Sequence, residues 1–340
     1  MTNRFTKNIL IFSLSVFLVF QVNSATGQSQ PPSSPVVLKA VTFPFLSFAP
    51  IFIAQEEGYF TEQGVQIEFI KMKEEFAFQA LAKGEADVWS GLVSIGALNA
   101  MHRGANIRFV AERGSFAADG CPYFGLVARK ALVESEALTS PGQLKGRNVA
   151  WYRASFEEYF LEKVLKQDGV VLGDLKKITI PVPADLGAMA KGTLDLTVTS
   201  EPWVRRLEQV GHGVLWVTAQ EVIPGFQFGT TMYGPYLIEK NPDAGNRFMV
   251  AYLKGIRQYN RGKTARNLQI LAKHTRLKED LLKQACWSQV NNDGRVNVQS
   301  IDAFQNWAKG KGYLDDLVLQ EKFMDSRFVD YANKFLAETQ

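Results

Sequence analysis

Two arginines in loops of this 340-residue chain are the side chains best suited to binding an anion. Arg113 lies in the loop 112–116 and Arg153 in the loop 152–155, and each loop follows an expected strand. A guanidinium grips a carboxylate or a sulfonate through two parallel hydrogen bonds. The two residues therefore indicate a site for a small organic acid.

Small residues near the starts of expected helices offer a second way to bind an anion. The free N–H groups and the dipole of a helix N-terminus favour negative charge by about 0.3–1 kcal/mol. Each serine taken alone is more often an ordinary helix cap, and that alternative stays open. The candidate ligand contacts of this kind are Ser47, Ser90, Gly91, Ser94, Ser115 and Ser155, with a further helix start at Ser200.

A carboxylate beside the same loops argues for a different ligand. Glu201 suits an amine or the edge of an aminopyrimidine, or it pairs with Arg205 one helical turn later. We expect the anion-binding groups to outweigh Glu201, so that the solute is anionic and partly apolar.

Aromatic residues crowd these loops: Phe45, Phe48, Trp89, Phe116, Tyr123, Tyr152, Phe156, Trp203, Phe226 and Phe228. Aromatic residues next to strands are usually core, so we expect about half of them to line nothing. The others would form an apolar wall against which a flat or aliphatic solute packs. The candidates for ligand contact among them are Phe48, Tyr152, Trp203 and Phe226.

Motifs for catalysis are missing from the sequence. Gly91 precedes Ser94 by three residues, whereas a nucleophile elbow needs a spacing of two. Gly262, Lys263 and Thr264 imitate a phosphate loop, but the glycine that should precede them is replaced by Arg257. The three histidines have no ligand spacing. We therefore expect no enzyme, no cofactor and no metal.

The elements that position these loops follow an α/β pattern, in which strands alternate with helices around mostly parallel sheets. After residue 242 the chain becomes mostly helical. The expected strands are 36–43, 66–72, 86–89, 107–111, 123–128, 147–151, 177–182, 194–199, 214–217 and 232–238.

The chain also repeats itself, which indicates two similarly built halves. Residues 82–88 return as 190–196, an offset of 108, and Val41 matches Val149 at the same offset. This spacing is too long for a solenoid repeat, so we expect a pair of lobes. Small ligands bind in the cleft between two such lobes.

An export signal precedes the lobes. Arg4 and Lys7 form a positive start, and residues 9–20 form an apolar run that is short for a membrane span. Small residues follow, so we expect a signal peptide over 1–27 and a flexible tether over 28–35. An uncleaved N-terminal anchor is the alternative.

Composition excludes several classes of protein. The formal charge of +4 includes Arg4 and Lys7, so the rest of the chain carries a charge too small to indicate nucleic-acid binding. The chain has two cysteines, Cys121 and Cys286. An oxidising compartment permits a disulfide, but two isolated cysteines are more often buried thiols.

Four blocks of the sequence resemble a known family. Residues 49–64 look like its signature, in which Ala49-Pro50 is followed by an apolar run, Gly58, Phe60 and Gly64. Residues 80–88, 144–150 and 201–203 are similarly typical, and the resemblance covers about residues 36–260. The family is that of the nitrate, sulfonate, taurine and thiamine-precursor solute-binding proteins of ABC importers, with the type II periplasmic binding fold.

The resemblance implies two lobes joined by two crossovers, a hinge, and docking of the closed form onto a membrane permease and its ATPase. We place lobe 1 at 36–127 plus 231–340, and lobe 2 at 128–230. We expect an exported, periplasmic monomer that captures a sulfonate- or carboxylate-like solute.

Three alternatives stay open. A pyrimidine, thiamine-precursor or amine binder would share the fold, and the other two are an enzyme on a small aromatic solute and a sensor domain. The synthases in the family that consume their own histidine carry clustered cysteines, which this chain lacks.

Overall fold

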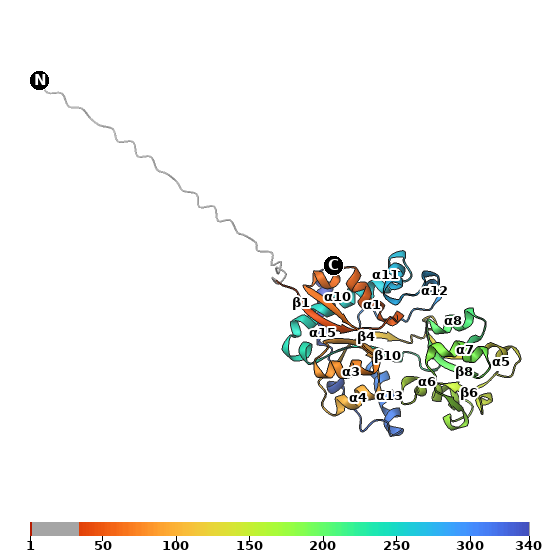
Figure 1. The fold of residues 1–340 in the computed structure, drawn as a ribbon. Helices are drawn as coiled ribbons and strands as arrows, with labels where there is room; N and C mark the ends of the chain where they lie inside the picture. The colour runs from red at the N-terminus through yellow and green to blue at the C-terminus, as the bar shows by residue number, and fades with distance from the viewer. Residues whose placement is uncertain (2–33, 340) are drawn as a thin grey trace. The chain divides into compact units, whose positions relative to one another are not determined.

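The computed structural model describes Met1 and residues 34–339 of the chain (Figure 1). The expected signal peptide and most of the expected tether therefore lie outside the described residues. Residues 34–339 belong to one compact unit. Across the described part of the chain, no helix has both the length and the apolar character needed to cross a membrane.

The first sheet has five strands in the order β2-β1-β3-β10-β4. Strand β1 pairs in parallel with β2 and β3, whereas β10 runs antiparallel to both β3 and β4. The bounds of these strands are β1 Val36–Val41, β2 Val65–Ile70, β3 Val88–Leu92, β4 Arg108–Ser115 and β10 Gln227–Tyr233.

The second sheet repeats this arrangement in the order β7-β6-β8-β5-β9. Strand β6 is parallel to β7 and β8, and β5 runs antiparallel to β8 and β9. The bounds are β5 Phe124–Arg129, β6 Asn148–Ala150, β7 Lys176–Ile178, β8 Leu196–Ser200 and β9 Gly213–Thr218. The α/β fold with two similarly built halves is thus confirmed.

The repeated sequence motif makes the same turn and the same contacts in each sheet. Gly84 and Gly192 both end a helix with a φ of 73°, a conformation that favours glycine. Asp87 then accepts the N–H of Lys39 at 2.8 Å, and Asp195 accepts that of Asn148 at 3.0 Å. In each sheet the aspartate therefore fastens the central strand to its neighbour.

Each sheet borrows one strand from the other half of the chain. Strand β5 follows the first sheet along the chain but pairs only in the second, and β10 returns to the first. The expected lobe boundaries at 127/128 and 230/231 cut through these two strands. The expected strand 232–238 is wrong in position, because β10 ends at Tyr233 and a π-helix, η5 Tyr236–Lys240, follows Pro235.

Helices flank the sheets and fill the C-terminal segment. Those up to residue 222 are α1 Ala49–Glu56, α2 Tyr59–Glu62, α3 Glu74–Lys83, α4 Ile95–His102, α5 Lys130–Glu134, α6 Phe156–Lys166, α7 Asp185–Ala190, α8 Trp203–Gln209 and α9 Ala219–Val222. Short 3-10 turns are η1 Leu46–Phe48, η2 Pro141–Leu144, η3 Leu172–Asp174 and η4 Val182–Ala184. The C-terminal helices are α10 Pro242–Tyr259, α11 Ala265–Thr275, α12 Glu279–Gln284, α13 Val298–Gly310, α14 Gln320–Phe323 and α15 Arg327–Glu338.

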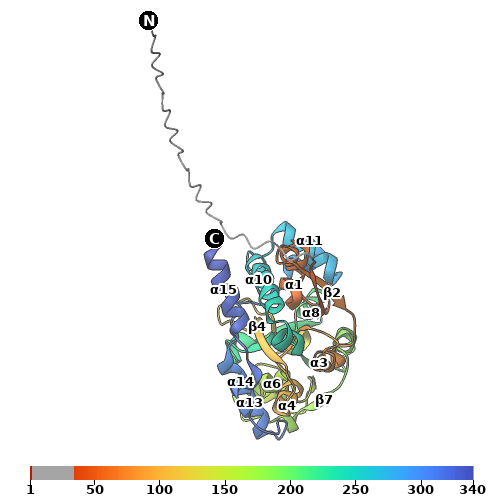
Figure 2. The ribbon, with the colours of Figure 1, turned by 90° about the vertical axis from the view of Figure 1, so that its left-hand side faces the viewer.

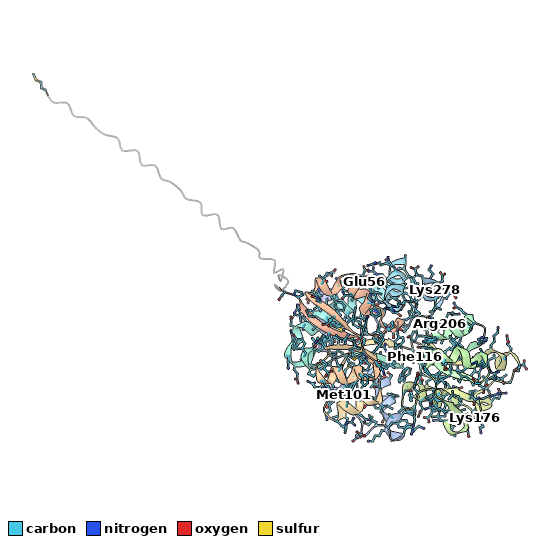
Figure 3. The ribbon with its side chains drawn as sticks, in the orientation of Figure 1. Glu56, Met101, Phe116, Lys176, Arg206 and Lys278 are labelled. Atoms are coloured by element: carbon cyan, nitrogen blue, oxygen red, sulfur yellow. A yellow bond between two sulfur atoms is a disulfide. The ribbon has the colours of Figure 1, made fainter. Side chains whose placement is uncertain are left out.

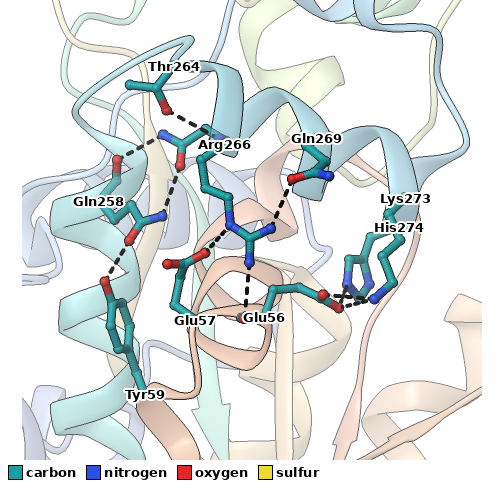
Figure 4. Close-up of polar contacts among 10 residues, drawn as sticks. Glu56, Glu57, Tyr59, Gln258, Thr264, Arg266, Gln269, Lys273 and His274 are labelled. Carbon is teal, nitrogen blue, oxygen red and sulfur yellow. Dashed lines mark hydrogen bonds and ion pairs between the residues drawn. The ribbon is translucent and has the colours of Figure 1, made fainter.

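The C-terminal segment packs mainly on the first sheet and its helices. Helix α10 contacts α1 and α15, and α15 contacts β4, an arrangement that Figure 2 shows from the side. Helix α11 is held on α1 by polar contacts, shown in Figure 4. There Arg266 pairs with Glu57 at 2.6 Å, and Glu56 pairs with Lys273 and His274.

The two cysteines form a disulfide, so the expectation of buried thiols is wrong. Cys121 lies between β4 and β5, and Cys286 follows α12. A separation of 165 residues says nothing about distance in space, but the folding back of the C-terminal segment brings the two Cα atoms to 5.7 Å. The bridge ties the C-terminal segment to the first crossover between the sheets.

Candidate functional site

A cavity of about 490 Å³ is lined by residues from both halves of the fold. Its lining is mostly apolar and rich in aromatic rings, and Phe116, labelled in Figure 3, lies between the two sheets. The lining residues are Phe45, Ser47, Leu92, Arg113, Phe116, Tyr123, Phe124, Tyr152, Phe156, Glu157, Pro181, Val182, Pro183, Thr199, Ser200, Glu201, Trp203 and Phe228. A cavity of this size and character suits a small, flat organic molecule.

Arg113 brings a positive charge to the wall formed by the first sheet. It lies near the end of β4 and is only 3% exposed. Its Nη1 donates to Ser47 Oγ at 2.7 Å, and its guanidinium lies 4.8 Å from the Phe48 ring centroid and 5.7 Å from that of Phe228. These neighbours hold the guanidinium in one orientation, as an anion-binding group requires.

Glu157 brings a carboxyl group to the wall formed by the second sheet. It lies in the first turn of α6, and its Oε2 accepts the backbone N–H of Tyr152 at 2.9 Å. The pKa of Glu157 is raised to about 8, mainly by burial and in part by the charge of Asp185, while the hydrogen bond from Tyr152 opposes the rise. At neutral pH this carboxyl group is therefore largely protonated.

Glu201 also lines the cavity, but its oxygens are engaged by the protein. Oε1 accepts the N–H of Cys286 at 3.0 Å, and Oε2 accepts that of Arg205 at 3.1 Å. Burial raises the pKa of Glu201, and these two backbone hydrogen bonds oppose the rise. Glu201 thus connects the second sheet to the C-terminal segment beside the disulfide.

Tyr123 lies on the first crossover between the sheets, where it is 5% exposed. Burial raises the pKa of its hydroxyl, while Arg113, Ser47 and Ser200 oppose the rise. Its ring stacks on Phe228 with centroids 5.5 Å apart. The hydroxyl therefore sits among polar groups from both walls of the cavity.

Of the candidate contacts chosen from sequence, the structure places five on the cavity wall. They are Ser47, Arg113, Tyr152, Glu201 and Trp203. Phe48 lies behind the wall, against the guanidinium of Arg113. Phe226 lies deeper, stacked against Phe116 in the aromatic core.

The remaining serines and Gly91 lie off the cavity and have structural partners. Ser90 and Gly91 lie inside β3, where Ser90 Oγ is 3.0 Å from Thr231 Oγ1. Ser94 caps α4 and Ser155 caps α6, each by accepting a backbone N–H at 3.2 Å. Ser115 ends β4, and its N–H donates to Gln289 O.

Arg153 points away from the cavity wall. It is exposed, its Nε donates to Tyr313 Oη at 3.2 Å, and its guanidinium lies 5.4 Å from the Tyr313 ring centroid. The two arginines that the sequence treats alike are therefore placed differently, one inside the site and one on the surface.

Several lining residues were not chosen from the sequence. Phe45, Phe116, Tyr123, Phe156 and Phe228 stand in the aromatic set, but nothing in the sequence separates them from core residues. A weaker signal exists for Thr199, which lies near the end of β8, and for the segment 181–183, which follows β7. Glu157 lies in the first turn of α6, near the helix start expected at Ser155. The described residues contain no cluster of three or more His, Cys, Asp or Glu side chains suited to a metal ion.

A family model described as NMT1/THI5 like matches residues 46–259. The chain belongs to the NMT1/THI5-like family. The matched region contains both sheets, apart from β1, and every residue that lines the cavity except Phe45. No curated protein matches the chain at a significant level.

Solved structures similar to this NMT1/THI5-like protein include binding proteins and an enzyme. The ligand-binding component of an ABC-type import system from Staphylococcus aureus, with zinc bound, is 16% identical with a TM-score of 0.72, over 87% of this chain and 99% of that one. The alkanesulfonate-binding protein SsuA from Xanthomonas axonopodis pv. citri, bound to MOPS, is 16% identical with a TM-score of 0.67, over 86% and 99%.

The desulfurization enzyme DSZB in complex with biphenyl-2-sulfinic acid is 12% identical with a TM-score of 0.68, over 88% of this chain and 99% of the enzyme. At these identities the similarities show that this NMT1/THI5-like protein shares the fold of these structures. The mixed α/β architecture and its helical C-terminus are thus confirmed.

Proposed function

We propose that this protein is the exported solute-binding component of an ABC importer, and that it captures a small aromatic acid in the cavity and presents it to a membrane permease. The observation that carries the proposal is the position of Arg113, a buried guanidinium on a cavity wall that is otherwise mostly apolar and rich in aromatic rings. Membership of the family supports the transport role.

The acidic group of the solute would bind Arg113. A guanidinium on a poorly solvated wall attracts an anion more strongly than one in water, because the local dielectric is low. Ser47 and the rings of Phe48 and Phe228 already fix its orientation, so little side-chain freedom is lost on binding. An organic acid therefore fits this wall better than a cation does.

The body of the solute would pack between aromatic rings from the two halves. Phe228 and Phe116 belong to the first-sheet side, and Phe156 and Trp203 to the second. Aromatic rings prefer flat partners in offset-stacked or edge-on arrangements. A solute that touches both halves favours the closed arrangement of the two sheets over an open one.

Glu201 is less suited to being the principal ligand contact than its charge suggests. Both of its oxygens already accept backbone N–H groups, from Cys286 and Arg205. A pyrimidine or amine bound at Glu201 would have to compete with these hydrogen bonds. An enzyme that acts on a small aromatic acid is the alternative of another class, and turnover of a bound solute would distinguish it.

A thermal-shift screen of the purified protein tests the proposal, with arene sulfonates, arene carboxylates, nitrate, pyrimidines and amines as candidates. A ligand at about 100 times its dissociation constant stabilises a protein by about 2.7 kcal/mol, which such a screen detects. We expect hits among the arene acids, recovery of the solute unchanged, and compaction in solution X-ray scattering. Hits confined to pyrimidines, or conversion of the solute, would contradict the proposal.

A further inference from the structure

A second, much smaller pocket adjoins the cavity on the side of the second sheet. Its volume is about 10 Å³, and Tyr152, Glu157 and Val182 line both spaces. Thr179, Asp185 and Thr197 add further polar groups to its lining. This volume matches one group the size of a water molecule.

Asp185 is buried in this small pocket with half of its carboxyl group unsatisfied. The residue is 2% exposed, and its Oδ2 accepts the Thr197 hydroxyl at 2.6 Å. Its Oδ1 is buried and has no hydrogen-bond partner among the described residues. A buried, unsatisfied carboxylate oxygen is costly, and such an atom calls for an occupant.

Glu157 brings a second carboxyl group to the same place. Within the described residues, no lysine or arginine forms an ion pair with Glu157 or Asp185. Lys177 of β7 instead places its Nζ 5.2 Å from the ring centroid of Trp151, another residue that lines the small pocket. Burial raises the pKa of Glu157 to about 8 and that of Asp185 to about 6, because the charged forms of both carboxyl groups are poorly solvated there.

We propose that the pocket between Glu157 and Asp185 is a subsite for a protonated amine, so that the solute is an arene with an acidic group at Arg113 and an amine at the opposite wall. This inference rests on the proposed function, because it assumes that the cavity binds an arene acid. An ammonium group has the size of a water molecule and carries three donors. It would satisfy Asp185 Oδ1 and give both carboxyl groups a cation.

Binding of the amine has a consequence for protons. An ammonium group beside the pair favours the ionised form of both carboxyl groups. The proton that Glu157 holds at neutral pH would then leave to solvent as the solute binds. An acid without the amine would release none at this subsite.

Calorimetric titration at neutral pH with two matched probes tests the subsite. The probes are para-(aminomethyl)benzoate, which carries an ammonium group, and para-ethylbenzoate, in which a methyl group takes its place. We expect the amine to bind at least about tenfold more tightly, as a charged hydrogen bond in a buried site allows. We also expect the binding enthalpy of the amine alone to depend on the ionisation enthalpy of the buffer.

Isosteric variants of the two carboxyl residues test whether the preference for the amine probe arises at this pocket. Asp185→Asn and Glu157→Gln should each reduce the preference for the amine to about twofold or less. Glu134→Gln, an exposed change on α5, is the matched control and should keep the full preference. Because the two probes are compared on the wild-type protein, the test stands even if a variant fails to fold.

The outcomes separate the subsite from the proposed function. Equal affinity of the two probes, with no proton release, overturns the subsite and leaves the proposed function standing. A preference that survives in both variants also overturns it, because the amine would then bind elsewhere. Failure of both probes to bind contradicts the proposed arene-acid function, and the subsite falls with it.

Discussion

Asp87 in the first sheet and Asp195 in the second make matching contacts 108 residues apart. Each accepts a backbone N–H from the neighbouring parallel strand, and each donates its own N–H back, to Lys39 O and to Asn148 O respectively. The difference between them is that Asp195 also pairs with Arg129 at 2.9 Å. The two halves therefore share the contacts that hold the sheets together.

The side chains that the halves present to the cavity differ. At the repeat offset, Leu92 of the first half corresponds to Ser200 of the second, and both line the cavity. The first half contributes the guanidinium of Arg113, whereas the second contributes the carboxyl group of Glu157. The scaffold is thus duplicated, while the charged groups that face the cavity differ between its two copies.

Removing the two repeated aspartates tests whether the shared contacts carry equal weight. Asp195→Ala should lower the free energy of unfolding by about 2–4 kcal/mol, because a backbone N–H and the guanidinium of Arg129 both lose their partner. Asp87→Ala should cost about 1–2 kcal/mol, because one backbone N–H is affected. Chemical denaturation measures both values.

Asp119→Ala is a suitable control for this pair, since that residue is exposed, lies outside the repeat, and has no side-chain hydrogen bond or ion pair among the described residues. If Asp87→Ala lowered the free energy of unfolding no more than this control does, the repeated aspartate would not stabilise the two halves in the same way.

The two buried carboxyl groups of the second half should make the stability of the protein depend on pH. Glu157 and Asp185 have pKa values raised to about 8 and about 6, so the folded state binds more protons than the unfolded state. Their contribution to stability is complete below the ordinary pKa values of 4.5 and 3.8 and is lost as pH rises through the folded values. Between pH 4.5 and about 8, the free energy of unfolding of the wild-type protein should therefore fall by about 1–2 kcal/mol more than that of the Glu157→Gln variant.

Thermal unfolding of both proteins across this range measures the difference. The comparison with wild type matters because Glu112, whose pKa burial raises to about 7, adds to the same decline in both proteins. A variant with the same pH slope as wild type would show that Glu157 is not protonated in the folded state.

The smallest expected loss of stability comes from breaking a hydrogen bond that joins the two halves. Tyr313 is fastened to α4 through Asn99, and its hydroxyl donates to Glu158 Oε1 on α6 at 2.8 Å. Tyr313→Phe removes this hydrogen bond and the one from Arg153, and should cost about 1 kcal/mol of stability. Tyr331→Phe, at an exposed position, is the control. Equal stability of the two variants would mean that this link between the halves contributes nothing.

Much of the fold could be predicted because local signals agree with it. The repeat, the helix-ending glycines and the alternation of strands and helices all report short-range geometry. Strand β10 was misplaced because Gln227, Thr230 and Thr231 are polar yet buried, which hides the strand from a hydrophobic pattern. Gln227 is satisfied there by donating to Gly114 O and Gly229 O.

The site was less predictable because side-chain direction depends on distant contacts. Arg153 turns outward toward Tyr313, 160 residues later in the chain. The pairing of Cys121 with Cys286 likewise depends on the C-terminal segment returning to the first crossover. Glu157 was passed over because a glutamate in the first turn of a helix is an ordinary surface residue unless tertiary packing buries it.

The most direct test of the account compares the two arginines. Calorimetric titration with para-ethylbenzoate should show that Arg113→Gln weakens binding by about 100-fold, as loss of a buried charge partner costs about 2–5 kcal/mol. Arg153→Gln, the matched control on the surface, should change the affinity by about twofold or less. Equal effects of the two substitutions, or a larger effect at Arg153, would contradict the claim that Arg113 holds the acidic group of the solute.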